Sequence, residues 1–168
     1  EAHFPAQLHD AKAAIRYLRA YADVFGVNTT KIAVWGESAG GHIAALVGLT
    51  GQRAELEGAI GVLHESSAVD AVVAWYAPAD FTLQPRERRS PEAIATRPPE
   101  MLTPPEELLA GGNDEQTLAV ASPISYVTST AAPFLLIHGT ADTVVPYVQS
   151  EVLTKALTDA GVAAQLVP

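Results

Sequence analysis

Apolar residues recur every three or four positions through residues 4–25, the spacing typical of one face of an amphipathic helix. The apolar positions are Phe4, Leu8, Ala11, Ile15, Leu18, Ala22 and Phe25. The charged residues that take the other face are Lys12, Arg16, Arg19 and Asp23. Pro5 near the start and Gly26 just past the end favour one helix between these two residues.

Short apolar runs, rich in β-branched and aromatic residues, predict four strands. The runs lie at residues 32–35, 69–75, 134–137 and 162–167. Between them, helical patterns run from the end of the first strand to about Leu49 and from Tyr147 to Ala160. Helices that alternate with short strands favour an α/β fold with a mostly parallel sheet and helices on both faces.

Residues 82–122 depart from this rhythm. Six of the twelve prolines lie between positions 85 and 105, which excludes a central sheet strand there. Residues 103–106 fit a capping box with proline at the first helical position, and predict a short helix that ends at Gly111. Because long excursions between sheet elements are uncommon unless functional, we expect a cap-like insertion over a pocket, in a single domain spanning residues 1–168. A solvated surface insertion is the alternative.

Composition and charge limit the classes of function. The 48% content of hydrophobic residues is typical of a globular domain. A net charge of −9 argues against a nucleic-acid or anionic-membrane partner and favours neutral or cationic substrates. The chain has no cysteine, so it has neither disulfides nor thiolate metal sites. No apolar run has the length of a membrane span and no signal peptide is visible, but the chain begins at Glu1, which leaves the compartment open.

The chemistry is concentrated in residues 36–40, GESAG, which match the G-x-S-x-G pattern between a predicted strand and a predicted helix. The pattern predicts a nucleophile elbow, in which strained backbone angles at Ser38 raise its hydroxyl above the sheet. Gly36 and Gly40 are expected where strand and helix cross too closely for any Cβ. The backbone N–H of Ala39 is expected to stabilise the oxyanion of acyl transfer. The alternative is a glycine-rich turn with the serine as helix N-cap.

A serine nucleophile needs a base, and the base needs a carboxylate that holds its tautomer. Asp142 is the best candidate for this acid, because it follows the strand at 134–137 and lies downstream of Ser38. Its alternative role is to cap the turn towards Pro146. Asp80, which also follows a strand, is the second candidate, although helix capping before the insertion suits it better.

The base and the second oxyanion donor are not found in the sequence. The five histidines are His3, His9, His42, His64 and His138. None of them follows Asp142, as the chain order serine, acid, histidine requires, and no Gly-rich loop of the H-G-G-G type precedes the first helix. We therefore expect a fragment of a longer gene product that is inactive by itself.

Several segments together resemble the α/β-hydrolase esterases. They are FPAQLHD at 4–10, VWGESAGGH at 34–42, WYAPADF at 75–81, ASPI at 121–124, HGTAD at 138–142 and VP at 145–146. They are most similar to the subgroup named for bifunctional feruloyl and acetyl xylan esterases, near the hormone-sensitive-lipase-like carboxylesterases. The resemblance implies an eight-stranded, mostly parallel sheet, of which this chain holds only the C-terminal half, with its four strands adjacent.

The resemblance also implies roles for individual residues. Ser38 would be the nucleophile, Ala39 an oxyanion donor and Asp142 the triad acid, whereas the family's histidine has no counterpart. It implies a serine carboxylesterase that forms an acyl-enzyme from small ester substrates, including acetyl or feruloyl esters of plant polysaccharide, with no cofactor or metal. A prolyl-oligopeptidase-type serine peptidase and a catalytically inactive binding protein are the alternatives. The exposed sheet edge at 32–35 would favour self-association.

Overall fold

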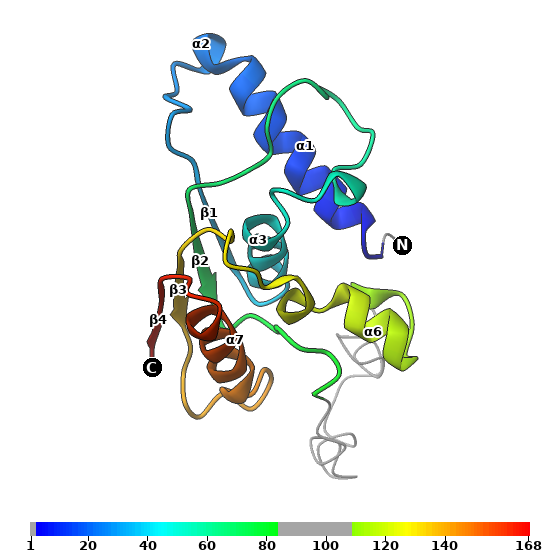
Figure 1. Ribbon diagram of the computed structural model, residues 1–168, viewed down its shortest axis with the longest axis vertical. Helices are drawn as coiled ribbons and strands as arrows, with labels where there is room; N and C mark the ends of the chain where they lie inside the picture. The colour runs from blue at the N-terminus through cyan, green and yellow to red at the C-terminus, as the bar shows by residue number, and fades with distance from the viewer. Residues whose placement is uncertain (1–2, 84–108) are drawn as a thin grey trace.

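The computed structural model describes residues 3–83 and 109–168, and contains one parallel sheet. Its strands are β1 (Ala33–Glu37), β2 (Ala71–Trp75), β3 (Phe134–Ile137) and β4 (Ala164–Val167). They lie in the order β1-β2-β3-β4, so strands that follow one another in the sequence are neighbours in the sheet (Figure 1). All four predicted strands are confirmed with small shifts of their ends, and β1 is an edge strand of this sheet as expected.

The described helices confirm most of the helical pattern. The α-helices are α1 (Ala6–Ala20), α2 (Ala22–Phe25), α3 (Ala39–Leu49), α6 (Glu115–Ala121) and α7 (Val148–Asp159), and two 3₁₀ helices are η1 (Ala54–Leu56) and η4 (Pro123–Tyr126). The single helix expected before Gly26 is instead divided at Tyr21, whose φ of −117° and ψ of 27° are not helical. Helix α6, inside the insertion, was not predicted, and the helix predicted from Thr103 lies mostly outside the described residues. None of the described helices is both long and apolar enough to cross a membrane.

The helices that pack on the sheet share one of its faces. Val72, Ala74, Phe134 and Leu136 point to this face and form the main core with residues of α3 and α7. Helix α1 packs against α3 on the same side. On the opposite face, alternate residues of β2 and β3 are only partly buried, and Trp35 of β1 is 65% exposed. The described elements therefore supply the helical layer expected for one face of the sheet.

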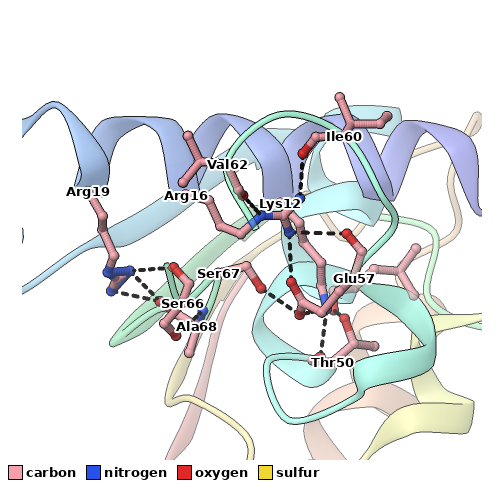
Figure 2. A network of polar contacts seen from close by, with 11 residues as sticks. Lys12, Arg16, Arg19, Thr50, Glu57, Ile60, Val62, Ser66, Ser67 and Ala68 are labelled. Carbon is pink, nitrogen blue, oxygen red and sulfur yellow. Dashed lines mark hydrogen bonds and ion pairs between the residues drawn. The ribbon is translucent and has the colours of Figure 1, made fainter. Parts of the chain in front are cut away.

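The charged residues of α1 differ most from the sequence-based expectation. The side chains of Lys12 and Arg16 are 0% and 2% exposed, although the pattern placed them on the polar face of the helix. Both contact Glu57, with Lys12 Nζ 2.7 Å from one carboxylate oxygen and Arg16 Nη1 2.7 Å from the other (Figure 2). The amphipathic pattern fails here because the partner carboxylate lies more than 40 residues away in the connection after α3.

This cluster connects α1 to the end of α3 and to the connection that follows it. Lys12 Nζ also donates to the carbonyl of Thr50, the C-cap residue just after α3. Arg16 donates to the carbonyls of Glu57, Ile60 and Val62 (Figure 2). Burial lowers the pKa of Lys12. Burial also opposes the charge of Glu57, but hydrogen bonds from Lys12 and Ser67 outweigh it and lower the pKa of the carboxyl group.

The first prediction concerns Glu57. Glu57→Gln leaves two buried cations without a carboxylate, and breaking a buried ion pair from one side costs about 3 kcal/mol or more. We expect urea unfolding to show a loss of that size. The matched control is Glu55→Gln, which removes an exposed pairing with Arg53 at 3.4 Å and should leave the urea midpoint unchanged. Equal effects of the two substitutions would contradict a role for the cluster in stability.

Candidate active site

Ser38 lies at the junction of β1 and α3 in a strained backbone conformation. Its φ of 51° and ψ of −121° are unusual for a residue with a side chain. The backbone N–H of Ser38 donates to Trp75 O at 2.9 Å, which fixes the junction to the end of β2. The hydroxyl makes no capping hydrogen bond to α3, so the N-cap alternative is not seen. Strain of this kind is characteristic of functional positions.

The glycines around Ser38 differ in the space that a Cβ would have at each position. A Cβ on Gly36 would lie 2.2 Å from Gly40 O, and one on Gly41 would lie 2.9 Å from the Ala77 side chain. A Cβ on Gly40 would meet nothing within 4 Å. The predicted Cβ collision is therefore confirmed for Gly36 and wrong for Gly40. The backbone of Gly40 occupies the space that a Cβ on Gly36 would need.

Ala39 is the first residue of α3 and is exposed. The first N–H groups of a helix have no acceptor inside the helix, and they favour negative charge nearby. The Ala39 N–H is thus available next to the Ser38 hydroxyl, as an oxyanion donor must be.

Asp142 lies in the loop after β3, at the same carboxyl edge of the sheet as Ser38, with β2 between the two strands. Its Oδ1 accepts hydrogen bonds from the backbone N–H groups of Val144 and Val145, at 2.7 and 2.9 Å. Asp142 therefore does cap its turn. Its Oδ2 lies 3.6 Å from Nε2 of His138, beyond hydrogen-bond distance. One carboxylate oxygen thus remains for a further donor.

Asp80, the second candidate acid, has a different environment. Its Oδ1 accepts from the backbone N–H groups of Thr82 and Leu83 and from the Thr82 hydroxyl. These bonds cap a turn at residues 80–83, at the start of the insertion, and the described part of that turn is not helical.

Two histidines are buried, and both bind backbone carbonyls. His42 Nε2 is 2.8 Å from Ala121 O, and burial lowers its pKa to about 4. His138 Nε2 is 2.8 Å from Val145 O, and its Nδ1 is 2.7 Å from Ser150 Oγ. His42 thus binds the end of α6 in the insertion, and His138 joins its own loop to α7. Within the described residues, no histidine forms a hydrogen bond with the Ser38 hydroxyl.

Sequence reasoning missed Tyr76, which follows β2 beside the serine. It has a positive φ of 36°, so two strained residues stand at the ends of neighbouring strands. The Tyr76 hydroxyl donates to Glu37 Oε2 at 2.6 Å, and this bond raises the pKa of the phenol. Only the positive φ shows that Tyr76 is strained, because a tyrosine after a strand carries no sequence signal of strain.

Known proteins with similar sequence include esterases. Esterase LipC of Mycobacterium tuberculosis (strain ATCC 25618 / H37Rv) is 36% identical over 154 residues, which cover 92% of this chain and 36% of LipC. This chain thus spans about a third of the length of that relative. Residues 1–157 match the family BD-FAE.

Solved structures of esterases share the fold. A truncated form of a carbohydrate esterase from gut microbiota has a TM-score of 0.80 and 32% identity, covering 99% of this chain and 60% of that chain. An acetyl ester-xyloside bifunctional hydrolase from Caldicellulosiruptor lactoaceticus has a TM-score of 0.74 and 28% identity, covering 98% and 55%. The fold is that of the α/β-hydrolase esterases, present in part, which confirms the resemblance. Within this class, the chain belongs to the BD-FAE family.

The geometry of the glycines gives the second prediction. Gly36→Ala places a methyl group against the backbone of Gly40, which no side-chain rotation can relieve, so we expect a loss of about 3 kcal/mol in the free energy of unfolding. Gly40→Ala is the matched control, with open space and a helical position where alanine is favoured by up to about 1 kcal/mol. Urea denaturation of both variants measures the difference. A loss at Gly40→Ala as large as at Gly36→Ala would show that our assignment of the crossing is wrong.

Proposed function

We propose that the polypeptide carrying this chain is a serine carboxylesterase with Ser38 as nucleophile. The observation that carries the proposal is the strained Ser38 between β1 and α3, with its hydroxyl free of any helix-capping bond. Membership of the BD-FAE family and the esterase names of the relatives support it.

Each residue has a defined step in the proposed reaction. Ser38 Oγ attacks the ester carbonyl carbon and gives its proton to a histidine from outside these residues. The carbonyl oxygen becomes negative and accepts a hydrogen bond from the Ala39 N–H. The free oxygen of Asp142 holds the histidine in the tautomer that can accept the proton. The histidine then protonates the leaving alcohol, and water hydrolyses the acyl-enzyme, so these steps use no metal or organic cofactor.

The proposed substrates are small neutral esters, with acetyl or feruloyl esters of plant polysaccharide as the first to test. Two structural relatives are named as a carbohydrate esterase and as an acetyl ester-xyloside hydrolase. The net charge of −9 supports an uncharged substrate over an anionic one.

The third prediction tests the nucleophile and acid in the longer polypeptide. Ser38→Ala should lower kcat for p-nitrophenyl acetate by about a millionfold, and Asp142→Asn by about ten-thousandfold, since the first removes the nucleophile and the second the correct tautomer. Ser129→Ala, at an exposed serine in the loop before β3, is the control and should leave kcat unchanged. A Ser38→Ala enzyme with normal turnover would refute the proposal. A fluorophosphonate probe that fails to label Ser38 would instead indicate the inactive binding protein.

The fourth prediction concerns the 168-residue chain alone. We expect no Ser38-dependent hydrolysis of p-nitrophenyl acetate, because its two buried histidines are engaged elsewhere. A missing second oxyanion donor removes a further factor of about 100 to 1,000. The measurement compares the chain with its Ser38→Ala variant at equal concentration. A rapid turnover that Ser38→Ala abolishes would contradict this expectation.

A further inference from the structure

The two ends of the 82–122 insertion meet at one point of the fold. The backbone N–H of Phe81 donates to Ser122 Oγ at 2.8 Å, and the N–H of Ile124 donates to Ala79 O at 3.0 Å. Ser122 Oγ in turn donates to Leu118 O at 2.7 Å. We call residues 79–83 and 118–124 the stem. The hydrogen bonds across the stem bring together residues 41 and 45 positions apart in the sequence.

His42 contacts both halves of the stem from the first turns of α3. Its side chain is fully buried, its Nε2 donates to Ala121 O at 2.8 Å, and its ring stacks on Phe81 with centroids 4.8 Å apart and planes at 20°. Since a carbonyl oxygen only accepts, Nε2 carries the hydrogen. Nδ1 has no hydrogen-bond partner among the described residues, so the neutral ring fits this position. His42 lies four residues after Ser38, and it thus joins the stem to the helix that begins at the nucleophile.

Gln149 binds the first half of the stem from α7. Its side-chain oxygen accepts from the backbone N–H groups of Ala79 and Asp80, both at 2.7 Å, and its nitrogen donates to Asp80 O at 2.8 Å. The residue is 3% exposed. Its neighbour Ser150 is bonded to His138, which also bonds the turn capped by Asp142. Gln149 therefore joins the stem to the helix that follows the candidate acid.

We propose that His42 and Gln149 are positioning residues that fix the stem of the insertion relative to the Ser38 helix and the Asp142 loop. Neither side chain has access to substrate, since both are buried. They act through the stem. Because the stem is fixed beside Ser38, the insertion is attached to the fold at a defined position next to the serine. Gln149 makes three hydrogen bonds to the backbone of the stem, and His42 makes one and stacks on the Phe81 ring. These contacts are more specific than apolar filling of the same space would be.

The fifth prediction measures hydrogen exchange at the stem in the 168-residue chain. His42→Phe keeps the stack on Phe81 and removes the donor to Ala121, and Gln149→Leu removes three hydrogen bonds. We expect each to raise the exchange rates of the Phe81 and Ile124 amides at least about tenfold, on the scale of a lost hydrogen bond. The Tyr76 amide, which donates to Ile137 O in the sheet, should change less than about twofold.

Three further variants separate a positioning role from simple packing. His42→Gln restores a donor that can reach Ala121 O and should return both stem amides to within about threefold of the wild-type rate. His64→Phe, at an 80% exposed side chain, should change neither amide. Ser122→Ala removes the acceptor for the Phe81 N–H together with the donor to Leu118 O. It serves if the larger substitutions unfold the chain, with faster exchange expected at Phe81. Unchanged stem exchange, an equal rise at Tyr76, or no rescue by glutamine would each overturn the proposal.

Discussion

The close crossing of β1 and α3 is the constraint on which the rest of the site depends. Gly36 lies against the carbonyl of Gly40, so the chain must reverse direction within a few residues between them. The residue in the middle, Ser38, takes a φ of 51° as a result, and its N–H bonds to the end of β2. The same reversal leaves the first N–H groups of α3 without acceptors next to the serine hydroxyl. The strained position of Ser38 and the free N–H groups beside it thus follow from one packing contact between two backbones.

A strained turn persists only where the surroundings hold it, and buried polar groups hold α3 at both ends. At the carboxyl end, Lys12 donates to Thr50 O, with Glu57 balancing its charge. Near the amino end, His42 binds Ala121 O and stacks on Phe81. The middle of the helix needs no such contacts, because its small and apolar residues pack directly on the sheet. Helix α3 is therefore fixed along its axis as well as against the sheet.

The sequence predicted the elements whose signals are local. Apolar runs located all four strands, and GESAG located the serine, because strand burial and the turn both depend on neighbours in the chain. The predictions that failed at Lys12, Arg16 and Gly40 concern contacts with residues that the local sequence pattern does not identify. Lys12 and Arg16 resemble residues of a solvated helix face until Glu57 comes beside them. Gly40 matched the motif, but it is Gly36 that lacks room for a Cβ, because the backbone of Gly40 lies against it. The positive φ of Tyr76 has no local signal either, since it arises where β2 ends between two other strands.

Neither of the two buried histidines is placed to act as a base for Ser38, and the reason is their hydrogen bonding rather than their place in the sequence. In each ring Nε2 faces a carbonyl oxygen, Ala121 in one case and Val145 in the other, so each Nε2 carries a hydrogen. Nδ1 of His138 then accepts from Ser150, and Nδ1 of His42 is enclosed in the core. A general base needs a free nitrogen within reach of the serine proton, and neither ring offers one. The hydrogen on Nε2 of His138 goes to Val145 O, so Oδ2 of Asp142, 3.6 Å from that nitrogen, can still accept a hydrogen bond from another donor.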